Sequence, residues 1–175
     1  VRQGKVRYIG CSNLKAWQVV DAQWISHTEH LARFICCQDE FSLLKREPDK
    51  ELLPAVAEYG LGLLPFFPLA SGLLTGKYKR GEPGPAGARL SNQGYLANRY
   101  MTDANMEKIE KLRGFCEARG HSMLELAFSW LLAHKPVASV IAGATRPEQL
   151  ELNVQAAGWA LTSDDLQQID AITAS

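Results

Sequence analysis

The sequence has no excess of charge of either sign, because 19 lysine and arginine residues balance 19 aspartate and glutamate residues. A balanced chain offers no broad basic surface, so neither nucleic acid nor an anionic membrane is expected as its partner. No apolar run reaches the roughly 18 residues that a membrane-spanning helix needs, and the first residues lack the apolar stretch of a signal peptide. We therefore expect a cytoplasmic protein. Because the chain begins with Val1 and soon enters a strand-like pattern, we also expect residues upstream.

Cysteine is scarce, and its spacing excludes the common metal and redox motifs. Cys11, Cys36, Cys37 and Cys116 form no C-x-x-C pair and lie among apolar residues. This pattern is typical of reduced, buried thiols, so we expect neither a disulfide nor a metal site. No G-x-G-x-x-G follows any apolar run, which excludes the Rossmann fingerprint.

Apolar runs alternate with helical patterns along the chain. β-rich runs followed by turn residues predict strands at residues 6–12, 34–41, 61–68 and 139–145. Apolar residues at helical spacing predict helices at residues 16–25, 49–59, 105–118, 123–134, 148–156 and 164–172. This alternation predicts an α/β fold with a parallel sheet.

Two architectures fit this order of elements. Four parallel strands form either a small doubly wound sheet or half of a (β/α)₈ barrel, which needs eight strands and typically about 250 residues. The Gly- and Pro-rich residues 79–99 have weak periodicity and predict a functional or mobile loop rather than core.

Polar and aromatic residues gather where the predicted strands end, which is where parallel α/β folds bind ligands. The amides and hydroxyls there suit a carboxamide, Phe66 offers a face for a heteroaromatic ring, and a helix start beside Arg146 suits a phosphate. The collected residues are Ser12, Asn13, Gln38, Glu40, Phe66, Phe67, Pro68, Leu69, Gly143, Ala144, Thr145 and Arg146. Taken singly, these residues also have purely structural explanations. Ser12 and Asn13 could cap a helix, Phe66 could be a core residue, and Gly143 could form a tight turn.

Four segments resemble consecutive signatures of the aldo-keto reductase family, in family order: GKVRYIGCSN, QDEFSLL, PFFPLASGLLTGKY and SVIAGATRPEQLELN. The likeness covers essentially the whole chain and is strongest to the bacterial oxidoreductase branch related to potassium-channel β subunits. The family folds as a (β/α)₈ TIM barrel, binds NADPH in extended form and reduces aldehydes or ketones by hydride transfer. The resemblance implies that this chain is the C-terminal half, strands five to eight, of an NADP-dependent oxidoreductase barrel.

The resemblance also implies roles for individual residues toward NADP(H). Ser12, Asn13 and Gln38 would hold the nicotinamide carboxamide, and Phe66 would stack on the ring where the family usually has Tyr or Trp. The residues beside the pyrophosphate would be Phe67, Pro68, Leu69, Ala70, Ser71, Gly72 and Lys77, with Arg89 folding over it. The adenosine 2′-phosphate would be bound by Gly143, Ala144, Thr145 and Arg146, with Gln149 and Asn153 facing the adenine end. Many family members have a basic residue at the position of Gln149 and a Glu at the position of Leu152. Arg146 is therefore the main positive charge available to the 2′-phosphate.

In this family the catalytic Asp, Tyr, Lys and His lie in the N-terminal half of the barrel, and no part of this chain resembles that half. We therefore assign no catalytic residue here. Tyr95, Tyr100 and Met101 are our candidates for substrate contact in the loop of residues 79–102. The expected partners are a small carbonyl substrate and the missing N-terminal half of the same barrel. Two alternatives stay open: a nicotinamide-nucleotide-binding or sensing subunit without fast catalysis, and a half-barrel that closes as a homo-oligomer.

Overall fold

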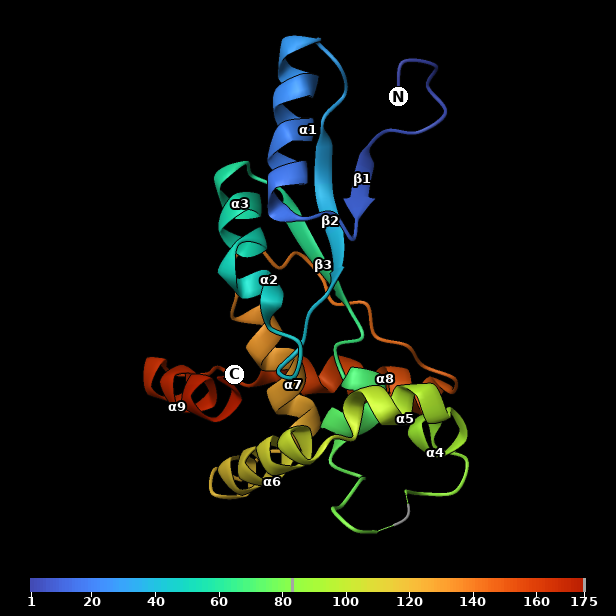
Figure 1. The fold of residues 1–175 in the computed structure, drawn as a ribbon, viewed down its shortest axis with the longest axis vertical. Coiled ribbons are helices and arrows are strands. Elements are labelled where there is room, and N and C mark those ends of the chain that lie inside the picture. The colour runs from blue at the N-terminus through green and yellow to red at the C-terminus, as the bar shows by residue number, and fades with distance from the viewer. Residues whose placement is uncertain (83, 175) are drawn as a thin grey trace.

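The computed structural model describes residues 1–82 and 84–174 and contains a three-stranded parallel sheet (Figure 1). Its strands are β1 (Ile9–Ser12), β2 (Phe34–Glu40) and β3 (Gly62–Phe66), with β2 in the middle. Helix α1 (Ala16–Thr28) connects the first two strands, and α2 (Glu47–Lys50) and α3 (Leu52–Glu58) connect the next two. The predicted α/β alternation and the first three strands are confirmed, with ends that differ by a few residues.

The predicted fourth strand at residues 139–145 is wrong. In its place, an extended segment makes two isolated parallel bridges to β3, Leu63 with Val137 and Phe66 with Ile141. The step between bridges is three residues on β3 and four on the other segment, so one extra residue interrupts the ladder. The pairing also stops at Ile141, which leaves residues 142–145 without strand partners.

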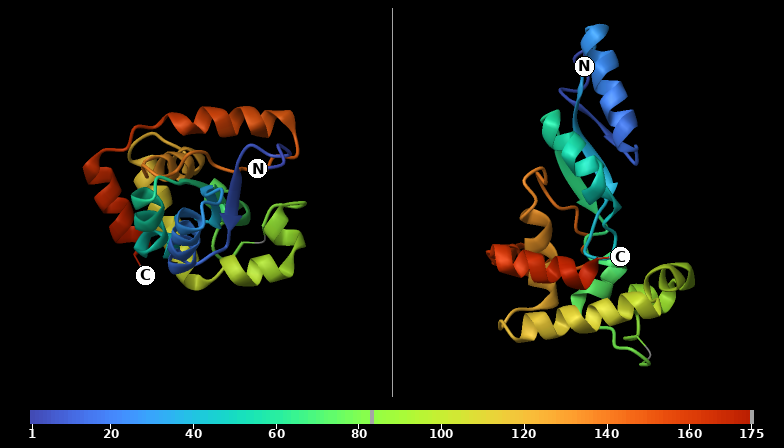
Figure 2. Two further views of the ribbon diagram at one scale, coloured as in Figure 1. Left: turned by 90° about the horizontal axis from the view of Figure 1, so that it is seen from above. Right: turned by 60° about the vertical axis from the view of Figure 1, so that its left-hand side comes forward.

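Helices cover only one face of the sheet. Val19 of α1 and Val56 of α3 are fully buried against strand residues of that face, such as Cys37 and Leu63. Along the opposite face no helix of the described chain lies beside the strands (Figures 1 and 2). The residues of that face are half-buried or exposed and comprise Gly10, Ser12, Cys36, Gln38, Gly62, Leu64 and Phe66.

The remaining elements pack beyond the carboxyl ends of the strands (Figure 1). They are η1 (Ala70–Thr75), α4 (Arg89–Asn92), α5 (Gly94–Tyr100), α6 (Asp103–Glu117), α7 (Met123–Leu132), α8 (Pro147–Gln155), η2 (Ala156–Gly158) and α9 (Ser163–Thr173). Local sequence explains several helix starts: the hydroxyls of Thr102, Ser122 and Thr162 each accept a backbone N–H three residues on. Glu125 and Asp165 return the bond and complete capping boxes.

The segment that we expected to be a loop outside the core is partly helical and packed. Within residues 79–99, apart from residue 83, α4 and most of α5 form, and Leu90 and Leu96 are almost completely buried. The buried Tyr78 hydroxyl accepts the Leu90 backbone N–H at 3.2 Å and so fixes the start of α4. The sequence pattern did not predict these helices, because each is too short to show a helical repeat of apolar residues.

Arg46 ties the C-terminal helix to the sheet layer. Its Nη1 donates to Asp170 Oδ1 at 2.7 Å and to Thr173 Oγ1 at 2.6 Å, both on α9. Its Nη2 lies 2.6 Å from Asp49 Oδ2 of α2, and its guanidinium lies 5.0 Å from the ring centre of Trp130 on α7. One half-buried arginine therefore joins three helices that are distant in sequence.

None of the helices in the described residues is long and apolar enough to cross a membrane. The same residues include no group of three or more histidine, cysteine or acidic side chains that could hold a metal ion. Cys11 and Cys37 lie opposite each other on β1 and β2 with their sulfurs 3.3 Å apart, and both are free thiols. Burial raises the pKa of both thiols, which favours the protonated form.

Two glycines allow a matched test of the packing between β3 and the extended segment. A Cβ on Gly62 would lie 2.9 Å from Ala138 Cβ, whereas a Cβ on Gly114 in α6 meets nothing within 4 Å. We expect Gly62→Ala to lower the free energy of unfolding by about 1–3 kcal/mol through overpacking. We expect Gly114→Ala to raise it by about 0.5–1 kcal/mol, because alanine loses less entropy in a helix. Urea unfolding of the full-length protein measures both, and an unchanged Gly62→Ala stability would contradict the pairing.

Candidate functional site

The ends of β1 and β2 bring three of the predicted residues together. Ser12 and Gln38 are register partners, and the Ser12 hydroxyl donates to the Gln38 carbonyl at 2.6 Å. Asn13 adopts the left-handed conformation (φ 57°) that asparagine tolerates, and its Nδ2 donates to Ser12 Oγ at 2.9 Å. The Gln38 side chain and the Asn13 Oδ1 make no hydrogen bond to any described residue. The Gln38 side-chain amide and the Asn13 Oδ1 are therefore available to a ligand at these strand ends.

One step along, Glu40 of β2 and Phe66 of β3 are register partners on the same face. Phe66 is half-buried and lies edge-on to Phe67, with ring centres 5.5 Å apart. Ile141 pairs with Phe66 from the other side. Phe66 therefore lies one strand away from Glu40, on the face that no helix of the described residues covers.

The turn after β3 is unusual in its backbone. Phe67, Ala70 and Ser71 have φ of 52°, 45° and 58°, and Gly72 has φ of 98°. Left-handed non-glycine residues cost free energy and gather at ligand sites. The Ser71 hydroxyl is buried and is the one buried side-chain polar atom of the described residues without a hydrogen-bond partner. A buried unpaired hydroxyl also costs free energy, so both features point to a missing partner at this turn.

Two cations flank this turn. A Cβ on Gly72 would lie 3.5 Å from both Lys77 Cε and Nζ, so the lysine side chain passes close over the turn. Arg89, the first residue of α4, lies with its guanidinium 5.9 Å from the ring centre of Phe67. Pro68 and Ala70 are buried and Leu69 is half-buried, so their side chains anchor the turn while the basic groups stay exposed. The predicted pyrophosphate residues are thus close together.

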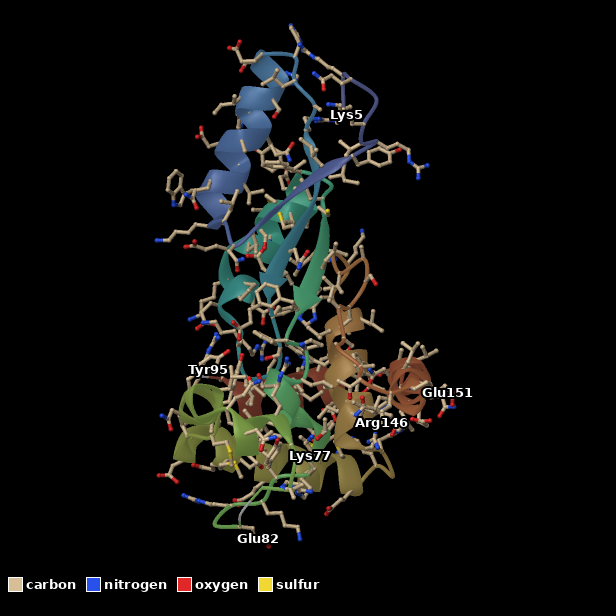
Figure 3. The ribbon with its side chains drawn as sticks, turned by 90° about the vertical axis from the view of Figure 1, so that its right-hand side faces the viewer. Lys5, Lys77, Glu82, Tyr95, Arg146 and Glu151 are labelled. Atoms are coloured by element: carbon tan, nitrogen blue, oxygen red, sulfur yellow. The ribbon has the colours of Figure 1, made fainter. Side chains whose placement is uncertain are left out.

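The start of α8 holds the last predicted group. Thr145 N–H and Oγ1 both donate to Gln149 Oε1, at 2.8 and 3.1 Å. Arg146 is the N-cap of α8 and is exposed, as are Gly143 and Ala144, while Asn153 is half-buried. Figure 3 shows Arg146 on the opposite side of the molecule from Tyr95, with Lys77 between them. The predicted site therefore extends from the strand ends past the β3 turn to α8.

Sequence reasoning placed Glu40 at a strand end and gave it no role. Its carboxylate accepts a hydrogen bond from the Tyr100 hydroxyl at 2.5 Å and another from Arg99, both on α5. Burial, and then the bond to Glu40, raises the pKa of Tyr100, so this phenol stays protonated and donates. Tyr100 is buried, which leaves Tyr95, at 71% exposure, as the accessible tyrosine of α5.

A cleft of about 360 Å³ opens at the same strand ends, next to α2 and α3. Its lining residues include Asn13, Asp39, Glu40, Lys45 and Leu52. Burial raises the pKa of Asp39, while the Asn13 backbone N–H lowers it. The alternation of β2 directs Asp39 away from the face that carries Gln38 and Glu40.

Comparison with known proteins identifies the class. The sequence profile of the Aldo/keto reductase family matches residues 1–174. The chain is 37% identical to L-glyceraldehyde 3-phosphate reductase of Escherichia coli O157:H7, an alignment that covers 97% of this chain and 50% of the relative. It is 35% identical to a probable voltage-gated potassium channel subunit beta of Oryza sativa subsp. japonica, covering 100% of this chain and 55% of the relative.

An uncharacterized oxidoreductase of Bacillus subtilis (strain 168) is 32% identical, covering 98% of this chain and 50% of the relative. The chain belongs to the aldo/keto reductase family, as its four motifs predict. It spans about half the length of the curated relatives that it matches.

Ser71 and Ser129 provide a matched pair of buried hydroxyls. Ser129 Oγ donates to the Ala156 carbonyl at 3.4 Å and accepts the Trp159 N–H at 3.2 Å, whereas Ser71 Oγ has no partner among the described residues. We expect Ser129→Ala to lower the free energy of unfolding by about 1–2 kcal/mol. We expect Ser71→Ala to leave it unchanged or raise it, measured by urea unfolding without ligand. An equal loss in both variants would show that Ser71 is bonded in the native protein.

Proposed function

We propose that this chain is the C-terminal, cofactor-binding half of an NADPH-dependent aldo-keto reductase that reduces aldehydes or ketones to alcohols. Family membership supports the class. The observation that carries the proposal is the strained turn after β3, where the buried Ser71 hydroxyl has no partner among the described residues. NADPH, when bound, supplies the hydride.

The residues present fit this cofactor. Gln38, Asn13 and Ser12 offer donors and acceptors that match a carboxamide, and Phe66 offers the ring face. Ser71, Lys77 and Arg89 would hold the pyrophosphate, together with backbone groups of Phe67, Pro68, Leu69, Ala70 and Gly72. Gly143, Ala144, Thr145 and Arg146 at the start of α8 would hold the 2′-phosphate, with Gln149 and Asn153 toward the adenine.

We do not assign Tyr100 as the proton donor for the carbonyl oxygen. Tyr100 is buried and already donates to Glu40, and burial raises its pKa further from the range that general acid catalysis requires. In this proposal the acid and its partners come from the N-terminal half of the same barrel. The chain alone is then inactive as a reductase.

Both ends of the structure favour packing against such a second half. At one end, β1 has an unpaired edge, and α1 exposes Trp17, Trp24 and Ile25. At the other end, Ile141 and the α8 residues Leu150, Leu152 and Val154 are exposed. Half of a closed barrel would have exposed apolar residues at both of its open ends and an uncovered sheet face between them. The described residues show this arrangement.

A sensing subunit without fast catalysis is the second candidate. The named potassium channel subunits beta among the relatives favour it, because the same family includes proteins described by a channel role. The two candidates share the NADPH site and differ in turnover. Single-turnover oxidation of bound NADPH by an aldehyde distinguishes them.

We expect residues 1–175 alone to self-associate, because the open edges have no partner in the described chain. Val154→Glu should reduce the mean mass in light scattering, because it places a charge on the exposed apolar face of α8. Glu151→Gln, on the same helix, is the control and should not reduce it. A monodisperse monomer with a cooperative thermal transition would contradict the half-barrel.

We expect Arg146→Ala in the full-length protein to weaken NADPH binding by about 10- to 100-fold, as loss of a charged hydrogen-bond partner predicts. NADH binding should change by less than about twofold. Fluorescence titration measures both, with Arg80→Ala as the control, because Arg80 pairs with Asp103 in a separate surface ion pair. Equal losses for both cofactors would contradict the 2′-phosphate assignment. Absence of binding by the unmodified protein would contradict the proposed function.

A further inference from the structure

The Glu40 carboxylate, at the end of β2, forms hydrogen bonds to two residues of helix α5. Glu40 has a side-chain exposure of 12% and binds both Tyr100 and Arg99, which lie about 60 positions later in the sequence. Asn105 Nδ2 donates to the Tyr100 carbonyl at 2.9 Å and fixes the end of the helix. The position of α5 beyond the strand ends is therefore determined by specific polar contacts (Figure 1).

This attachment lies beside the proposed nicotinamide position. Glu40 is the register partner of Phe66, so both side chains leave the sheet on the uncovered face, in adjacent strands. Gln38 lies two residues earlier on the same strand and the same face. The Arg99 guanidinium that binds Glu40 therefore lies near the strand end that carries Phe66, and so near the proposed nicotinamide position.

Arg99 has hydrogen-bonding capacity that Glu40 does not use. Only its Nη2 has a partner among the described residues, so the Nε and Nη1 donors remain available. The side chain is 43% exposed, and its guanidinium lies 5.0 Å from the Tyr100 ring centre, which limits its orientations. Because the Tyr100 hydroxyl also donates to Glu40, the carboxylate shares its charge between two donors. Arg99 thus keeps charged N–H donors that can bind a second anion.

We propose that Arg99 is the specificity-determining residue of the substrate site and binds the carboxylate or phosphate of an anionic carbonyl compound. Glu40 and Tyr100 are positioning residues that hold this arginine. This inference rests on the proposed reductase function and adds a substrate class to it. The competing role for Arg99 is a tether for α5 alone, which predicts no discrimination between charged and uncharged substrates.

The test compares matched aldehydes in the full-length protein with NADPH. Glyceraldehyde 3-phosphate is paired with glyceraldehyde, and 4-oxobutanoate with butanal, so that the two pairs distinguish phosphate from carboxylate. We expect Arg99→Gln to lower kcat/KM for the preferred anionic aldehyde by about 10- to 100-fold and for its uncharged partner by less than about threefold. Arg99→Lys should recover part of the loss, because lysine keeps the positive charge but not the guanidinium geometry.

Arg80→Gln is the control, because this arginine also lies within residues 79–102 but pairs with Asp103 on the surface. If Arg99→Gln lowers kcat/KM equally for charged and uncharged aldehydes, the proposal is overturned. Arg99 would then serve only to hold α5 in place. If the unmodified protein reduces uncharged aldehydes and discriminates against both anionic ones, the substrate class is wrong while the reductase function stands.

A second measurement does not depend on turnover. Calorimetric titration with inorganic phosphate and with butyrate should detect binding that Arg99→Gln abolishes and Arg80→Gln leaves intact. Tyr100→Phe should raise KM for the anionic aldehyde more than it lowers kcat, and should speed hydrogen exchange in residues 94–100. Anion binding that survives Arg99→Gln would overturn the assignment even if no aldehyde is reduced. The reductase proposal fails separately if no carbonyl compound is reduced.

Discussion

The parallel register of β2 with its two neighbours is the constraint on which the rest of the structure depends. Ser12 pairs with Gln38, and Glu40 pairs with Phe66, so these side chains project from one face at the carboxyl ends of adjacent strands. Because side chains alternate with a period of two, a shift of one residue would turn Gln38 and Glu40 into the helix layer and bring Asp39 out. The free amides, the phenyl ring and the attachment of α5 would be lost together.

The same alternation explains why the two faces differ so strongly. Cys37 and Leu63 face α1 and α3 and are fully buried, whereas Gln38 and Leu64 face no helix. The covered face gains the free energy of apolar burial, whereas the side chains of the other face remain half-buried or exposed and gain less. A sheet that is stabilised from one side can therefore leave its other face free for the proposed cofactor.

Strain and unpaired groups are concentrated where the sheet ends. The turn from Phe67 to Gly72 combines left-handed residues with the unpaired Ser71 hydroxyl, and it lies against the densely packed Leu73, Leu74 and Tyr78. Such a conformation persists only where surrounding packing compensates for it. The core formed by η1, α6 and α7 is thus also the support for the proposed pyrophosphate site.

The sequence alone determined the α/β order, the first three strands, the family and the grouping of Ser12, Asn13 and Gln38, because local periodicity and short motifs carry this information. It did not predict the bulge that reduces residues 137–141 to two bridges, nor the burial of Leu90 and Leu96 in short helices. The contacts of Glu40 with Arg99 and Tyr100, and of Arg46 with Asp170, were decided only by the tertiary structure. These contacts join residues 59 to 124 positions apart, and no local pattern specifies which distant side chain a charged group will meet.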